Sequence, residues 1–79
     1  MTLMPLYAFV QGDSMGVVVL AHSDGTAADL AEKLMQASAV RVGRREKFRV
    51  MSGERILDLG ATLRMQGVQA LDRVDLVWE

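Results

Sequence analysis

The sequence predicts an α+β fold, in which one helix packs across a mixed sheet of about five strands. Short β-branched and aliphatic stretches lie near both ends of the chain, and a single stretch between them repeats apolar residues at helical spacing. The 79 residues are the size of one domain, and 51% of them are hydrophobic, which is too high for a disordered chain. We therefore expect a single domain over residues 1–79.

The first part of the chain predicts a hairpin. Leu3–Gln11 is rich in residues that favour extended structure, and Pro5 near its start suits an edge or entry position of a strand. Gly12 and Asp13 mark a turn, after which the valine-rich Met15–Ala21 predicts a second strand.

A helix is predicted next, over Ala27–Ser38. Thr26 is a good N-cap residue, and Asp29 three positions later approximates a capping box. Alanines and leucines recur at helical spacing and give the helix a small apolar face that suits close packing on a sheet.

The second half of the chain predicts a second hairpin and a last strand. Gly43 marks a turn after the helix, and Ser52-Gly53 marks a tight turn. The predicted elements are a strand over Lys47–Met51, a short strand over Arg55–Asp58, one helical turn over Thr62–Met65 and a last strand over Arg73–Trp78.

No residues with the spacing of a catalytic, cofactor-binding or metal site stand out. The chain has no cysteine, and His22 is its only histidine, so thiolate clusters and the usual zinc sites are not expected. The glycines do not form a phosphate-binding loop. The N-terminus lacks a basic region before its apolar residues, and no apolar run approaches the ~20 residues of a membrane span, so we expect a cytoplasmic protein.

The stretch VRVGRREKFRV, residues 40–50, contains over half of the basic residues of a chain whose net charge is −1. This acidic balance and the single aromatic residue of the stretch argue against nucleic acid, and a loop that enters a strand is not the basic helix that membranes bind. Two interpretations stay open: a solvated loop, or a protein contact in which Arg41, Arg44 and Arg45 pair with carboxylates.

Tyr7 and Phe9 share one face of the first predicted strand, and Leu6, Ala8 and Val10 share the other. If the aliphatic set faces the helix, the two aromatic residues point outward and mark an interface. The alternation also allows the reverse, with both aromatic residues in the core.

The methionines are expected in the core, where their flexible side chains fill gaps. This expectation is firmest for Met15 and Met35 and extends to Met1, Met4, Met51 and Met65.

The order of the predicted elements resembles the β-grasp, or ubiquitin-like, architecture. The final stretch TLRMQGVQALDRVDLVW adds to the resemblance, with a Leu in a short turn, a Gly-hydrophobic pair and a polar loop before a last apolar strand. Ubiquitin-like modifiers and sulfur carriers end in Gly-Gly, whereas this chain ends VDLVWE, so conjugation and sulfur transfer are not expected. β-Grasp ferredoxins need cysteines, which this chain lacks.

Four blocks resemble the small ubiquitin-like subunit of bacterial multicomponent toluene, alkene and related monooxygenases. They are LMPLYAFV, DLAEKLM, AVRVGRREKFRV and RVDLVWE. The resemblance implies a non-catalytic subunit without a cofactor of its own, which packs on the outside of a large hydroxylase subunit that holds a carboxylate-bridged diiron centre. Arg41, Arg44 and Arg45 would then meet acidic groups of that large subunit, in a system that hydroxylates aromatic hydrocarbons or alkenes.

Two further interpretations of the same fold also make the chain a binding protein. The small ubiquitin-like protein of bacterial type VII secretion loci has a similar length and also lacks a Gly-Gly tail. Another ubiquitin-like protein-binding module is the remaining alternative.

Overall fold

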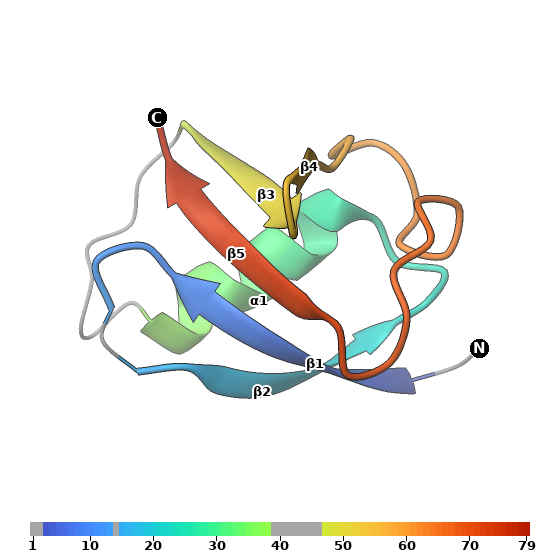
Figure 1. Cartoon of the computed structure of the whole chain (residues 1–79), viewed down its shortest axis with the longest axis horizontal. Helices are drawn as coiled ribbons and strands as arrows, with labels where there is room; N and C mark the ends of the chain where they lie inside the picture. The colour runs from blue at the N-terminus through green and yellow to red at the C-terminus, as the bar shows by residue number, and fades with distance from the viewer. Residues whose placement is uncertain (1–2, 14, 39–46) are drawn as a thin grey trace.

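The computed structural model describes residues 3–13, 15–38 and 47–79. A five-stranded sheet has the strand order β2-β1-β5-β3-β4, in which β1 and β5 are parallel and the other neighbours are antiparallel. The strands are β1 (Leu3–Val10), β2 (Val17–His22), β3 (Phe48–Ser52), β4 (Arg55–Ile56) and β5 (Arg73–Trp78). The helix α1 (Ala27–Ser38) lies across one face of the sheet (Figure 1). The predicted mixed sheet with one helix is confirmed.

The predicted hairpin of β1 and β2 is present, but β2 begins at Val17 and not at Met15. The Asp13 side chain accepts the Met15 N–H at 3.1 Å, which holds Met15 in the turn. Val17 is the first residue of β2, where it pairs with Ala8, and it packs against the core where Met15 does not. Met15 is exposed, so the prediction that it fills the core is wrong.

The other methionines divide between the core and the surface. Met4 and Met35 are buried, as predicted, and Met51 is half-buried on β3. Met65 is 80% exposed in the loop before β5, so its predicted core position is wrong. Met1 lies outside the described residues.

The N-terminus of α1 has the predicted capping box. The Asp29 N–H donates to Thr26 Oγ1 at 3.1 Å, and the Thr26 N–H donates to Asp29 Oδ2 at 3.2 Å. Two N–H groups that would lack partners at a helix start are thereby satisfied. The helix consequently begins at Ala27, which fixes the face that Leu30 and Leu34 turn toward the sheet.

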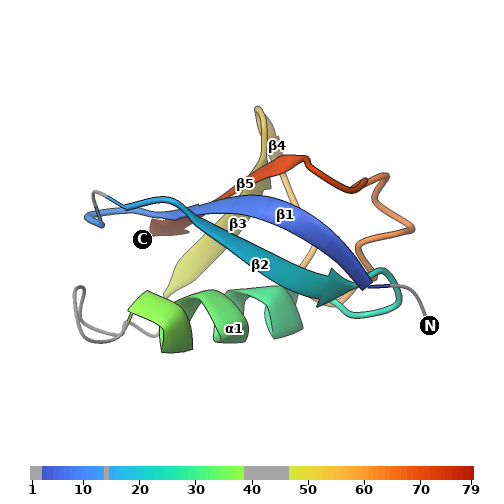
Figure 2. The ribbon, with the colours of Figure 1, turned by 90° about the horizontal axis from the view of Figure 1, so that it is seen from below.

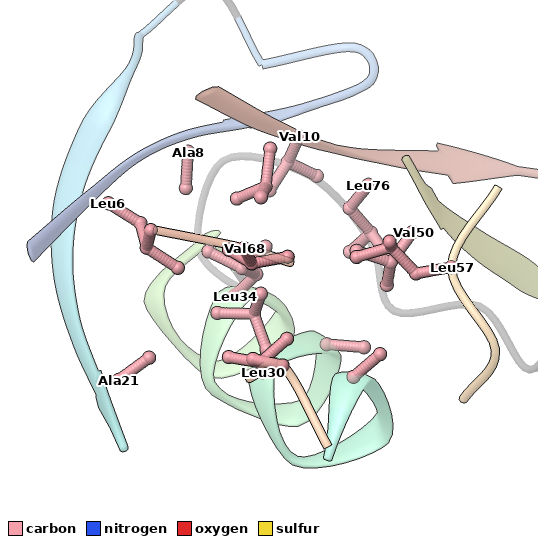
Figure 3. Close-up of a cluster of buried hydrophobic side chains, with 14 of the residues drawn as sticks. Leu6, Ala8, Val10, Ala21, Leu30, Leu34, Val50, Leu57, Val68 and Leu76 are labelled. Atoms are coloured by element: carbon pink, nitrogen blue, oxygen red, sulfur yellow. The ribbon is translucent and has the colours of Figure 1, made fainter. Parts of the chain in front are cut away.

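The core lies between α1 and the sheet, as Figure 3 shows. Alternate residues of β1 and β5 point into it, and Leu6, Ala8, Val74 and Leu76 are fully buried. Leu30 and Leu34 of α1 pack against this layer (Figure 3). Buried side chains thus recur at every second residue of the strands and at every third or fourth residue of the helix, as the sequence predicts.

The connection from β4 to β5 closes one end of this core. Leu57, Leu63 and Val68 are buried there, and the Leu63 N–H donates to the Gly25 carbonyl at 2.9 Å. Gln66 holds the connection together, because its Oε1 accepts the Asp58 N–H at 2.7 Å and its Nε2 donates to the Asp58 carbonyl at 2.9 Å.

Two short elements in this region differ from prediction. The strand predicted over Arg55–Asp58 pairs only at Arg55–Ile56, and the predicted helical turn over Thr62–Met65 is a series of hydrogen-bonded turns.

Candidate protein-binding surface

The sheet has a covered face and an open face. Figure 2 shows α1 on one side of the sheet, and among the described elements none covers the other side, here called the outer face. Tyr7 and Phe9 both lie on the outer face, because Leu6, Ala8 and Val10 on the same strand are buried against the helix. Of the two orientations of this strand that the sequence allows, the structure has the one with the aliphatic side chains toward the helix and the aromatic side chains outward.

Exposed apolar side chains gather on the outer face of β1 and β2. Tyr7 lies opposite Val18, Leu20 is the next residue on this face of β2 and lies opposite Pro5, and Leu3 lies beyond Pro5 on β1. Their exposed fractions are 53% for Leu3, 46% for Tyr7, 62% for Val18 and 53% for Leu20. We call these four residues the outer apolar patch. A contiguous set of exposed apolar side chains is typical of a surface that another protein covers.

Phe9 is more enclosed than Tyr7, although both lie on one face of β1. The guanidinium carbon of Arg73 lies 4.2 Å from the centroid of the Phe9 ring, a cation–π contact. Arg73 in turn binds Asp75 through two N–H groups at 3.2 and 3.3 Å. On its other flank the ring lies over Gly16, where a Cβ atom would come within 2.4 Å of Phe9 Cε1. Tyr7 is therefore the more accessible aromatic residue of the predicted pair.

Leu71 adds a further exposed leucine close to β1. Its N–H donates to the Pro5 carbonyl at 2.6 Å, its side chain is 61% exposed, and its φ of 71° lies in the left-handed region. Leucine is strained there, whereas glycine or asparagine is not. A side chain that neither enters the core nor suits its backbone is a candidate for contact with another molecule.

A shallow hollow of about 390 Å³ lies farther along the outer face, over β5. Phe9, Met51 and Val77 contribute apolar side chains, and Gln11 lines the same hollow. The Gln11 side chain accepts the Trp78 N–H at 2.8 Å, and the indole N–H donates to the Gln11 carbonyl at 2.9 Å. These bonds hold the turn after β1 against the end of β5.

The remaining predicted interface residues, Arg41, Arg44 and Arg45, lie outside the described residues. Sequence reasoning named Tyr7 and Phe9 but missed Val18, Leu20 and Leu71. Val18 and Leu20 lie in a continuous apolar run, so alternation with polar residues could not mark them as exposed. Across the described ranges no group of three or more His, Cys, Asp or Glu side chains is arranged to hold a metal ion. No helix within those ranges is long and apolar enough to cross a membrane.

No protein-family model matches the chain, and no curated protein matches it. Among solved structures, the chain is similar over 99% of its length to the whole of a chain in the toluene 4-monooxygenase HD complex with the inhibitor 4-bromobenzoate (TM-score 0.90, 22% identity). It is also similar to Caldiarchaeum subterraneum ubiquitin (TM-score 0.82, 16% identity, 99% of this chain and 95% of that chain). The ubiquitin-like domain of Plasmodium falciparum Dsk2 is a third match (TM-score 0.81, 22% identity, 99% and 100%). The chain therefore has the ubiquitin-like β-grasp fold.

Proposed function

We propose that this chain is the non-catalytic accessory subunit of a bacterial multicomponent diiron monooxygenase and binds the large hydroxylase subunit. The observation that carries the proposal is the match to the toluene 4-monooxygenase complex component, which spans 99% of this chain and 100% of that one. The four sequence blocks that resemble the small subunits of such enzymes support it independently. In this proposal the diiron centre and the hydroxylation chemistry belong to the large subunit.

The outer face supplies the contact surface in this proposal. A stable interface covers about 800 Å² of each partner, roughly one sixth of the 4858 Å² surface of this chain. In this proposal the interface lies on the outer face, where the outer apolar patch provides an uncharged region on β1 and β2 with Tyr7 as an aromatic anchor. Arg41, Arg44 and Arg45 would add pairs with acidic groups of the large subunit.

Co-expression with a candidate large hydroxylase subunit tests the proposal. We expect the two chains to co-purify, and the Tyr7→Ser variant to bind about 30-fold more weakly, since an aromatic anchor contributes roughly 2 kcal/mol. Met65→Ser is the matched control, because Met65 is exposed and lies outside the patch. If the two variants bound the hydroxylase subunit with equal affinity, the outer apolar patch would not be part of the interface.

Two further outcomes bear on the partner. Arg44→Glu with Arg45→Glu should weaken assembly, and more so at low salt, because dissolved salt screens charge pairs between two proteins. Failure to co-purify with the hydroxylase subunit, together with capture of a type VII secretion component, would favour the alternative, with which the ubiquitin-like fold is equally compatible.

A further inference from the structure

Leu71 has a backbone conformation that the chain elsewhere gives to glycine. Among the described residues with a positive φ, three are glycines and one is a leucine: Gly12, Gly53, Gly67 and Leu71. In the left-handed region the Cβ atom of an L-residue comes too close to the following carbonyl oxygen, and glycine avoids this contact. Leucine is therefore not the residue that this position of the backbone favours.

Hydrogen bonds to β1 hold the backbone around residue 71 in place. The Leu71 N–H donates to the Pro5 carbonyl at 2.6 Å, and the Tyr7 N–H donates to the Asp72 carbonyl at 3.0 Å. Two consecutive residues thus bond to alternate residues of β1, directly before β5 begins at Arg73. The fold fixes the conformation of residue 71 through main-chain bonds, which any residue type can make.

The core does not account for the leucine either. The Leu71 side chain is 61% exposed, whereas Leu63 and Val68 of the same connection are buried and close the core at this end. A side chain that stays largely in water contributes little of the free energy that burial supplies. Because neither the backbone nor the core favours leucine here, its role is sought in contact with another molecule.

The position of Leu71 places it beside the outer apolar patch. Its backbone is bonded to Pro5, which lies on the outer face between Leu3 and Tyr7, two members of that patch. A stable interface uses about 20–30 residues of each partner, so residues that surround the patch must take part in it. Leu71 is an exposed apolar residue at the border of the patch, and it extends the apolar surface toward β5.

The charged neighbours of Leu71 already have partners within the chain. Asp72 Oδ2 accepts the Gln69 N–H at 2.9 Å. Arg73 binds Asp75 through two N–H groups at 3.2 and 3.3 Å. A partner can therefore cover Leu71 without leaving an unpaired charge in the interface, which would be costly. The partner surface that fits Leu71 is an apolar pocket rather than a charged one.

We propose that Leu71 is a contact residue for the large hydroxylase subunit, and that its side chain enters an apolar pocket of that subunit at the border of the outer apolar patch. The strained backbone lowers the stability of the free chain, and the contact raises the affinity of the complex. This inference rests on the proposed function and adds to it a residue whose effects on stability and on binding have opposite signs.

Two measurements on Leu71→Asn test this opposition. Asparagine suits the left-handed backbone but lacks the aliphatic side chain. In the isolated chain the urea midpoint, followed by Trp78 fluorescence, should rise by about 0.5 M. The affinity for the purified large hydroxylase subunit should fall about ten-fold, which is the size of effect expected when a well-packed contact side chain is removed.

Two control variants separate the side chain from the backbone. Leu71→Met keeps a long apolar side chain in the same backbone conformation, so its affinity should stay within about two-fold of the wild-type value. Met65→Ala removes a side chain that is 80% exposed in the same connection but lies outside the patch. It should leave both the midpoint and the affinity unchanged.

Several results would overturn the inference. If the wild-type chain binds the subunit and Leu71→Asn binds equally well, Leu71 is not a contact residue, although the proposed function stands. Equal weakening by Leu71→Met and Leu71→Asn would place the effect in the backbone, and a lower urea midpoint for Leu71→Asn would show that leucine serves the free chain. A dimer of the isolated chain that Leu71→Asn abolishes would assign Leu71 to a second copy. If the wild-type chain does not bind the subunit, the proposed function and this inference both fail.

Discussion

Gly16→Ala should destabilise the chain by about 1–2 kcal/mol through its contact with Phe9. The new Cβ would come within 2.4 Å of Phe9 Cε1 and 2.9 Å of Cζ, so the ring must move. Overpacking of this kind costs roughly 1–3 kcal/mol. Displacement of the ring can also break its contact with Arg73, which contributes about 0.5–1 kcal/mol to stability. Replacing glycine by alanine offsets about 0.4–1 kcal/mol by restricting the unfolded chain. Phe9 is only half-buried, so the ring can shift outward in part, which keeps the net loss at the lower end of the range.

Urea unfolding monitored by fluorescence of the single tryptophan, Trp78, measures this loss. Gly60→Ala is the matched control, because the nearest atom to its Cβ is Asp58 Oδ1 at 3.6 Å, an ordinary contact. We expect that variant to be unchanged or stabilised by up to about 1 kcal/mol. In a Phe9→Ala background the clash is absent, so Gly16→Ala should then behave like Gly60→Ala. An equal loss in both backgrounds would refute the assignment of the cost to the ring.

Three further substitutions test the core, the helix start and the strained loop by the same unfolding assay. Leu34→Ala should cost about 2–5 kcal/mol because Leu34 is fully buried, whereas Met65→Ala should change stability by less than about 0.5 kcal/mol; similar losses would contradict the burial pattern. Thr26→Ala should cost about 1 kcal/mol because the Asp29 N–H loses its acceptor, Thr26 Oγ1, and an unchanged midpoint would speak against the capping box. Leu71→Asn should stabilise the chain by about 0.5–1 kcal/mol through relief of backbone strain; a loss would show that the leucine packs favourably.

The sequence alone predicted the order of the elements and which residues of a strand share a face. Leu6, Ala8 and Val10 on one strand share a face, as do Val74 and Leu76 on another, and both sets are buried. The helix start was equally predictable, because the capping box is a local motif with short-range bonds.

Features that depend on contacts between distant segments were not predictable. Alternation shows which residues of a strand share a face, but not which face meets the helix, so the direction of Tyr7 and Phe9 needed the tertiary structure. The surface position of Met15 follows from one bond to Asp13, which competes with strand pairing. The position of β2 at one edge of the sheet follows from the strand order, which places segments from the two ends of the chain at the centre of the sheet.

The parallel pairing of β1 with β5 has a consequence for synthesis of the chain. Tyr7 pairs with Arg73, so the middle of the sheet joins the first strand to the last one. Contacts of such long sequence separation slow folding, because the loop between them must close before the contacts form. During translation the β1–β2 hairpin and α1 emerge before β5 exists, and their apolar faces have no central strand to cover them. These apolar faces therefore stay uncovered until Arg73–Trp78 leaves the ribosome, and exposed apolar surface of this kind favours aggregation.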